Sequence, residues 1–305
     1  MPCGGLRATA AAPAPASRHT AMTLTIRDRP SPNHGERGEP PNLRPVDMLV
    51  LHYTGMPSAA AALERLCDPQ ARVSAHYLVE EDGTIWRLVA EARRAFHAGV
   101  SYWQGDTDLN RLSIGIEIVN PGHQWGYRPF SAAQMTAVEE LCRAIVARHP
   151  IPPHRVVGHS DIAPDRKSDP GELFDWPRLA RAGIGLWPLP RPQAEAGRGR
   201  GVGIVQRTAA LADLARIGYP VAVGSEDVAL AAFQRRFRPA RWDGLLDRET
   251  SERLRDVRQA VEAAQALCEE ELDGGAPPPA LQLRRDGGGW RRCCCARGRA
   301  TSCPA

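Results

Sequence analysis

The chain has 305 residues, of which 43% are hydrophobic, and this length allows one or two globular domains. Its formal net charge is +4, but residues 281–305 carry six arginines and one aspartate, so the rest of the chain is nearly neutral. A neutral body argues against nucleic-acid binding and against a membrane-surface role. The sequence contains no run of about 18 apolar residues, so it predicts no transmembrane helix.

Residues 1–44 are rich in proline, glycine and arginine, so we expect them to be mostly irregular, with residues 31–37 laid over the domain surface. They contain no apolar core of signal-peptide length. This absence favours a cytoplasmic protein, whereas a periplasmic location would follow if translation began at another site. The eight cysteines show no C-x-x-C spacing and no disulfide framework, and we expect a monomer.

The first predicted strand, residues 46–52, ends in a candidate metal ligand. It contains a continuously apolar run, as expected of a central strand that is covered on both faces. His52 follows the run, where the strand opens into a loop. Alone, such a histidine is more often a packed or solvated residue than a ligand. Ser58 then predicts the N-cap of a helix that ends near Cys67.

Residues 74–89 are expected to form a hairpin, because two strand-like runs flank an Asp-Gly pair at 82–83. Four side chains in and after this hairpin are candidate substrate contacts: His76, His97, Trp103 and Asn110. The alternative interpretation of the histidines and aromatic residues is a polar cap on an aromatic cluster.

Residues 112–120 (LSIGIEIVN) predict a strand in which three isoleucines share one face and Glu117 lies on the other. A carboxylate in a buried strand is costly unless another group pairs with it. Burial also tends to raise the pKa of a carboxyl group towards neutrality, where it can exchange protons. Glu117 is therefore either a catalytic group or an edge residue that faces water.

Residues 131–149 predict an amphipathic helix capped by Ser131. A short strand at 155–158 follows it, and residues 172–182 predict a further helix. Between these two elements, the segment GHSDIAPDRKSDPG holds three polar candidates for a site: His159, Lys167 and Asp169.

Lys167 is the only lysine in the chain, since every other basic side chain of the Lys and Arg class is an arginine. Arginine is a broad, permanently charged fork, whereas lysine is a compact point charge that can lose its proton. A site that requires lysine is one interpretation of this pattern. The chance survival of one lysine in a loop is the other.

The C-terminal part predicts a second, smaller unit at residues 201–265, after a linker at 188–200 that is rich in proline, glycine and arginine. Three helices are expected in this unit, at about 205–217, 227–237 and 247–264. About 60 residues are marginally enough for an independent fold. Residues 266–305 lack the apolar pattern of a core and are expected to be disordered.

His52, His159 and Asp169 are of the residue types that hold a catalytic zinc ion, which takes three protein ligands and leaves one position to water. Zinc makes water a nucleophile near neutral pH. Glu117 would take the proton of the water and pass it to a leaving nitrogen. Lys167 would face the oxygen that gains charge. These roles predict an amide hydrolase.

The same residues carry a resemblance to a known family. Residues 46–188 resemble the zinc-dependent N-acetylmuramoyl-L-alanine amidases of type 2 in the motifs VLHYT, SAHYLVEEDG, FHAG, LSIGIEIVN, VVGHSDIAPDRKSDPG and LFDWPRLARAGIGLWP. The resemblance implies an α/β fold with a central mixed β-sheet flanked by helices. It also implies zinc on His52, His159 and Asp169, with Glu117 and Lys167 catalytic. Asp169 matches the bacterial branch, because the phage and recognition-protein branches generally carry a cysteine there.

The C-terminal unit resembles a type 1 peptidoglycan-binding domain in AFQRRFRP and WDGLLDRETSERL, which implies a small three-helix domain. The implied substrate is peptidoglycan or a muropeptide, in cell-wall degradation, turnover or recycling. Two alternatives stay open at this point. One is a non-catalytic peptidoglycan-binding protein, and the other is an enzyme that recycles anhydro-muropeptides in the cytoplasm. The absent signal peptide favours recycling, whereas the wall-binding module opposes it.

Overall fold

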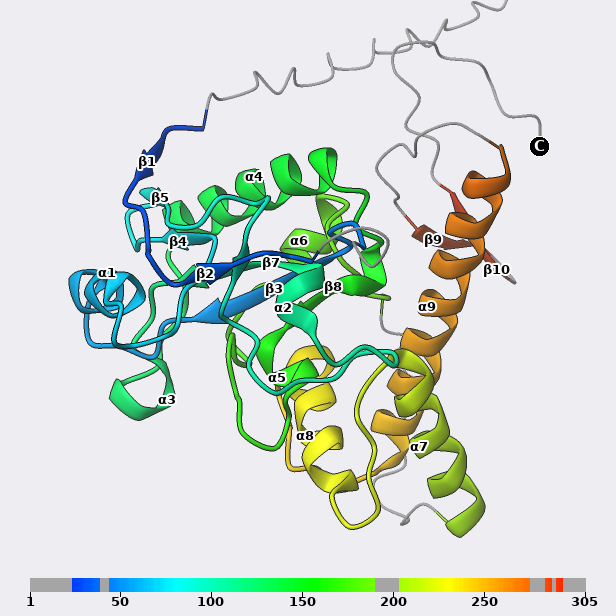
Figure 1. The fold of residues 1–305 in the computed structure, drawn as a ribbon. Helices are drawn as coiled ribbons and strands as arrows, with labels where there is room; N and C mark the ends of the chain where they lie inside the picture. The colour runs from blue at the N-terminus through cyan, green and yellow to red at the C-terminus, as the bar shows by residue number, and fades with distance from the viewer. Residues whose placement is uncertain (1–23, 39–43, 190–202, 275–282, 287–288, 293–305) are drawn as a thin grey trace, which may run out of the picture.

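The computed structural model describes residues 24–38, 44–189, 203–274, 283–286 and 289–292. Its centre is a six-stranded sheet with the order β1-β5-β4-β7-β3-β8 (Figure 1). The strands are β1 (Ile26–Asp28), β3 (Met48–Tyr53), β4 (Tyr77–Val79), β5 (Ile85–Arg87), β7 (Ser113–Ile118) and β8 (Val156–Gly158). The β4–β5 pair is antiparallel and the other pairs are parallel, so the predicted mixed sheet is confirmed.

Helices cover both faces of the sheet. In Figure 1, α4 (Ala132–Arg148) lies along one face, and α5 (His159–Ile162) and the C-terminal helices lie on the other. Alternate residues of β3 point to opposite faces. Leu49 and Leu51 therefore pack in the cluster that includes α4, whereas Met48 and Val50 pack in the cluster that continues into the C-terminal helices.

Several local predictions are confirmed. The Ser58 hydroxyl accepts a hydrogen bond from the backbone N–H of Ala61 and caps α1 (Ala59–Cys67). The Ser131 hydroxyl caps α4 in the same way by accepting from Gln134. The turn at 82–83 joins β4 and β5 as an antiparallel hairpin. These features are local in sequence, so the residues that specify them lie next to each other.

The described part of the N-terminal segment, which was expected to be mostly irregular, contains two short strands. β1 adds to the edge of the sheet beside β5, and β2 (His34–Gly35) pairs antiparallel with β6 (Arg94–Ala95). Arg37 is buried and donates to the backbone carbonyl of Ser113 at 2.9 Å. Strands of two or three residues are too short to show a periodic pattern in the sequence. Their positions are set by the strands with which they pair in the fold.

The remaining connections between the strands and helices of residues 44–189 contain short helices. They are α2 (Leu109–Leu112), α3 (Gly122–Trp125), the 3-10 helix η1 (Pro153–Arg155) and α6 (Trp176–Arg181). The helix predicted at 172–182 is therefore shorter than expected. It begins after Asp175, whose carboxylate accepts from the backbone N–H of Arg178 and caps it.

Three helices form the C-terminal unit, as predicted: α7 (Ile204–Ile217), α8 (Glu226–Phe237) and α9 (Arg248–Gly274). α9 continues beyond the expected end at residue 264. β9 (Leu283–Asp286) and β10 (Gly289–Arg292) pair antiparallel in a region for which disorder was expected. Most of the predicted linker at 188–200 and most of the tail lie outside the described residues.

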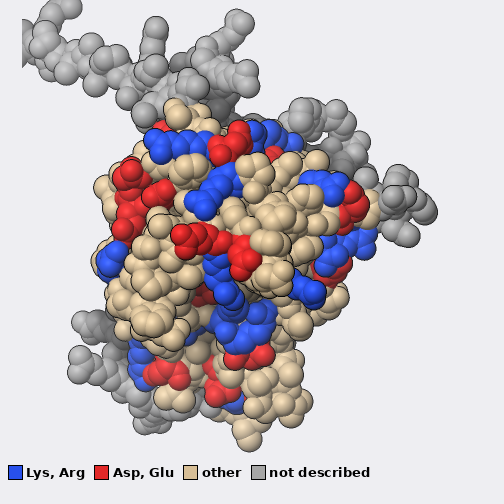
Figure 2. Space-filling model, turned by 60° about the vertical axis from the view of Figure 1, so that its left-hand side comes forward, with Lys and Arg blue, Asp and Glu red and all other residues tan. Residues whose placement is uncertain are grey.

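The distribution of charged side chains on the surface agrees with the nearly neutral net charge of most of the chain. On the face shown in Figure 2, basic and acidic side chains are interspersed with uncharged ones, without the continuous basic surface that is typical of nucleic-acid binding. None of the helices within the described ranges has both the length and the apolar character that crossing a membrane requires.

Candidate active site

The candidate site lies at the carboxyl ends of β3, β7 and β8. His52 in β3 pairs in register with Glu117 in β7. Residues that pair across two parallel strands point to the same face, so both side chains project from one side of the sheet. The isoleucines of β7 pack on the opposite side with α4, which confirms the predicted division of this strand.

His159 and Asp169 complete a cluster with His52. His159 begins α5 directly after β8, and the backbone N–H of Ser160 donates to the Asp169 carbonyl at 2.9 Å. The Nδ1 atom of His52 lies 2.9 Å from Nδ1 of His159 and 3.1 Å from Oδ2 of Asp169. Nδ1 of His159 lies 3.0 Å from the same oxygen. All three residues are buried, and their ligand atoms lie within 4.8 Å of one another. The structure therefore brings the three predicted ligands together.

The three donor atoms fit one zinc ion. Ligands about 2.0–2.2 Å from a tetrahedral zinc lie about 3.3–3.6 Å apart, slightly farther than the spacing observed here. Each imidazole also has a partner for its other nitrogen. Nε2 of His159 donates to the Ala98 carbonyl at 3.2 Å, and Nε2 of His52 lies 3.1 Å from Nδ1 of His97. Histidine ligands of zinc usually have such partners, which leave the Nδ1 lone pair free for the metal.

The charges of the cluster also suit a cation. Burial, reinforced by His159, lowers the pKa of His52 to about 4, so its imidazole is neutral at pH 7. Burial alone would raise the pKa of Asp169, but the two imidazoles hold this pKa well below its usual value, so the carboxylate is ionised. A neutral imidazole and an ionised carboxylate are the protonation states in which these residues bind metals.

Glu117 has a buried oxygen without a partner. Its Oε2 atom makes no hydrogen bond with any of the described residues, although the residue as a whole is only partly buried. Burial, together with the charge of Asp169, raises the pKa of Glu117 well above its usual value, and the charge of Lys167 opposes this shift. A carboxyl group in such a position is suited to receive and release a proton near neutrality.

These groups line one pocket of about 430 Å³. Its walls include Glu117, His159, Asp169 and also Lys167, the only lysine of the chain. The backbone N–H of Lys167 donates to the Ala163 carbonyl at 3.0 Å, so the turn that follows α5 holds this residue beside the cluster. Chemistry was predicted for five residues, and four of them line this pocket. The fifth, His52, is buried and does not line it.

His97 lines the pocket, but its main contacts are with the protein. Its Nδ1 faces Nε2 of His52, and its Nε2 lies 3.3 Å from the Ser113 hydroxyl, which in turn donates to the Leu109 carbonyl at 2.6 Å. Burial and the proximity of His52 lower the pKa of His97 well below its usual value, so the ring is neutral. This chain of hydrogen bonds fixes the tautomer in which His52 can bind a metal.

The sequence contains a signal for this role of His97 that motif spacing alone does not reveal. Gly115 interrupts the run of isoleucines in β7, and a Cβ atom at this position would lie 2.5 Å from Cγ of His97. Glycine is thus required there because the imidazole ring packs directly on the strand.

The other three predicted substrate contacts do not line the pocket. The Asn110 side chain accepts from the backbone N–H groups of residues 97 and 98 at 3.0 and 2.8 Å, so it shapes the loop that carries the pocket histidine. His76 is fully buried and accepts from the backbone N–H of Gly115 at 2.9 Å. Trp103 is buried at the junction with the C-terminal helices. The structure therefore places these side chains as internal supports.

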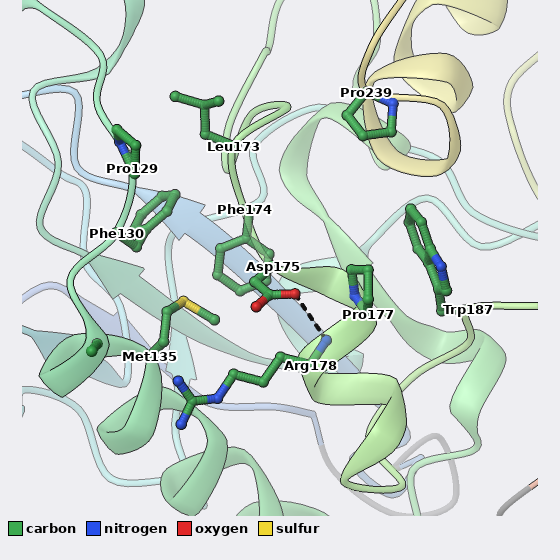
Figure 3. A pocket seen from close by; sticks show the side chains of 11 residues that line it. Pro129, Phe130, Met135, Leu173, Phe174, Asp175, Pro177, Arg178, Trp187 and Pro239 are labelled. Atoms are coloured by element: carbon green, nitrogen blue, oxygen red, sulfur yellow. Dashed lines mark hydrogen bonds between the residues drawn. The ribbon is translucent and has the colours of Figure 1, made fainter. Parts of the chain in front are cut away.

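A second and larger pocket, of about 540 Å³, shares no lining residue with the first (Figure 3). Its lining is mostly apolar or aromatic and includes Phe130, Phe174 and Trp187. Its ionisable residues are Asp175 and Arg178, and the Asp175 carboxylate is occupied as the cap of α6. The larger pocket thus lacks the histidines and the buried carboxylate oxygen without a partner that the smaller pocket offers.

Comparison with known proteins shows which family this chain is similar to. Residues 42–172 match the family described as N-acetylmuramoyl-L-alanine amidase. The N-acetylmuramoyl-L-alanine amidase AmiD of Escherichia coli is 41% identical over 222 residues, which are 67% of this chain and 79% of AmiD. The 1,6-anhydro-N-acetylmuramyl-L-alanine amidase AmpD of Escherichia coli is 36% identical over 167 residues, which are 49% of this chain and 87% of AmpD.

The fold is similar to that of a solved complex of Escherichia coli AmiD with anhydro-N-acetylmuramic acid-L-Ala-D-gamma-Glu-L-Lys. The TM-score is 0.62 at 36% sequence identity, and the similarity covers 74% of this chain and 96% of the AmiD chain. The coverage shows that the similarity includes C-terminal helices as well as the sheet, whereas the match to AmpD spans about half of this chain.

Proposed function

This chain belongs to the N-acetylmuramoyl-L-alanine amidase family, and we propose that it hydrolyses the amide bond between N-acetylmuramic acid and L-alanine with zinc held by His52, His159 and Asp169. One observation carries the proposal. Three buried donor atoms lie 2.9–3.1 Å from one another, beside a buried Glu117 oxygen that has no partner. The amidase activity named for AmiD and AmpD supports the class of reaction.

Glu117 and Lys167 have different roles in the proposed hydrolysis. Zinc, when bound, supplies Lewis acidity and lowers the pKa of water, so that water can act as the nucleophile near neutral pH. Glu117 takes a proton from the water and gives it to the leaving nitrogen, which requires a carboxylate that no other group occupies. Lys167 supplies positive charge to the carbonyl oxygen that becomes negative as water adds. One such donor typically contributes about 3–4 kcal/mol to the transition state.

The C-terminal helices are proposed to bind peptidoglycan. In this division, residues 45–187 form the amidase domain, residues 188–200 the linker and residues 201–265 the binding domain. The two motifs that resemble a peptidoglycan-binding domain are joined by Gln234 of α8. Its side chain accepts from the backbone N–H of Gly244 at 2.8 Å and donates to the Thr250 hydroxyl at 3.0 Å. Cosedimentation of the chain with insoluble murein measures this binding.

Anhydro-muropeptides are the first substrates to test. The solved AmiD complex contains an anhydro-N-acetylmuramic acid peptide, and AmpD is named for a 1,6-anhydro substrate. The pocket of about 430 Å³ is of the size that holds a small molecule. A comparison of turnover on soluble anhydro-muropeptide and on intact murein would separate recycling from wall cleavage.

Release of the free stem peptide from a purified anhydro-muropeptide tests the proposed function. We expect a strong chelator to abolish the release and added zinc to restore it, because the three proposed ligands are buried and their ligand atoms lie close together. His159→Ala should release no peptide at any zinc concentration. Binding of murein without peptide release, with or without zinc, would instead identify a non-catalytic peptidoglycan-binding protein.

A further inference from the structure

The C-terminal helices reach back to the short helix that carries His159. α5 spans only His159–Ile162, and so short a helix is not stable through its own hydrogen bonds. Asp161, two residues after His159, is fully buried in the wall between the sheet and α8. A buried carboxylate is costly unless hydrogen-bond donors surround it. The donors around Asp161 therefore help to decide where α5 lies.

Two of the three donors to the Asp161 carboxylate come from the C-terminal unit. Oδ2 accepts from the backbone N–H of Gly158 at 2.8 Å and from Nη1 of Arg236 at 2.7 Å. Oδ1 accepts from the hydroxyl of Tyr219 at 2.5 Å. The hydrogen bond from Gly158 closes the turn that contains His159. The hydrogen bonds from Arg236 and Tyr219 fix the carboxylate that closes this turn.

Arg236 and Tyr219 are themselves fixed by packing. Arg236 is 5% exposed, its Nη2 donates to the Val156 carbonyl of β8 at 3.0 Å, and its guanidinium lies 4.1 Å from the centre of the Trp176 ring. The Tyr219 ring packs edge-on against Trp103 at 5.1 Å. Trp103 was predicted to contact substrate, and its position against Tyr219 explains why it is buried instead.

We propose that Arg236 and Tyr219 are positioning residues for the metal ligand His159, acting through Asp161, so that the C-terminal unit supports the active site as well as binding the wall. This inference rests on the proposed function, because it takes His159 as a zinc ligand. The backbone bond from Ser160 to Asp169 couples the two ligand segments, so a displacement of α5 alters the spacing of both ligands. Loss of either donor should therefore weaken zinc binding, even where attachment to murein plays no part.

The test uses the full chain and measures zinc affinity by competition with a chromophoric chelator, at a temperature below the unfolding transition of every variant. Arg236→Met should bind zinc about 10–100-fold more weakly than the parent, and Tyr219→Phe should weaken it in the same direction by less. The matched control is Arg253→Met. Arg253 is 7% exposed, stacks over Trp187 and does not contact Asp161. Its replacement should lower thermal stability but leave zinc affinity within about twofold of the parent.

The outcomes separate the inference from the proposed function. Zinc affinities of Arg236→Met and Tyr219→Phe within about twofold of the parent would overturn the inference and leave the proposed function intact. Equal weakening in Arg253→Met would also overturn it, because general destabilisation would then explain the effect. If Arg236→Met fails to fold, Tyr219→Phe decides, since it removes one hydroxyl and keeps the ring. A parent protein that binds no zinc would refute the proposed function first.

Discussion

Replacing Gly115 by alanine should disturb the proposed metal site without changing any of the proposed metal ligands. A Cβ atom at this position would lie 2.5 Å from Cγ and 2.6 Å from Nδ1 of His97. Carbon atoms in ordinary contact are about 3.5–4.0 Å apart, so the imidazole must move by about 1 Å or the strand must bend away. The backbone φ of Gly115 is not in the left-handed region, so the clash is the main effect of this substitution.

The size of the effect follows from the contacts of the ring. Overpacking of this kind typically costs about 1–3 kcal/mol in the free energy of unfolding. A shift of about 1 Å also breaks the 3.1 Å hydrogen bond between His97 and His52. Loss of such a partner to a metal-binding histidine usually lowers metal affinity or activity by about 10–100-fold. Gly115→Ala should therefore be both less stable and weaker in zinc binding than the parent.

Urea unfolding, zinc competition and muropeptide hydrolysis measure the three consequences. Gly35→Ala is the matched control, since its new Cβ would meet the Phe96 ring at an ordinary 3.7 Å. In the double variant Gly115→Ala with His97→Ala, the clash is removed, so the cost in stability should be less than the sum of the single costs. Zinc affinity should stay low in the double variant, because His52 still lacks its partner. Parental stability and zinc affinity in Gly115→Ala would refute this account of His97.

Three further predictions concern catalysis and acid stability. Glu117→Gln should lower kcat by about 10²–10⁴-fold while zinc stays bound, as metal analysis and peptide release would show; full activity would exclude Glu117 as the base. Lys167→Arg should lower activity by about 10²–10³-fold with zinc retained, and near-normal turnover would mean that any cation suffices. Burial, with Arg37 beside it, lowers the pKa of His76 to about 3. The unfolded chain binds this proton near pH 6.5, so the free energy of unfolding should fall between about pH 6.5 and 3, by up to about 1.4 kcal/mol per pH unit. Urea unfolding at several pH values should show a shallower fall in His76→Gln, and equal slopes would contradict the prediction.

Some features of this protein were decided by residues that are neighbours in the sequence. The apolar run before His52 predicts a buried strand that ends at a loop, and the alternation in β7 places Glu117 on the face opposite the isoleucines. Ser58 and Ser131 predict the starts of α1 and α4 because a helix N-cap bonds to groups three residues away. The fold class and the three candidate ligand positions followed from such local patterns and from the resemblance in motifs.

The roles of the other histidines and of Trp103 were decided only by the tertiary structure. His76 and His97 both occur in histidine-containing motifs, yet His76 is fully buried and bonds to the backbone of β7, whereas His97 lies within hydrogen-bond distance of His52. Their difference arises from contacts with residues far apart in the sequence: Gly115 lies 39 positions from His76, and His52 lies 45 positions from His97. For the same reason, the sequence did not reveal that β1 pairs with β5.

The sequence by itself determined which side chains are available for metal binding and proton transfer, because residue type and local periodicity set their chemistry and the face on which they lie. The tertiary structure alone decided which groups hold them in place. Two of the three donors to Asp161 come from residues 58 and 75 positions away, and no local pattern links these two residues to it. A buried carboxylate needs partners wherever the fold can supply them, so the support of the site depends on packing between distant segments.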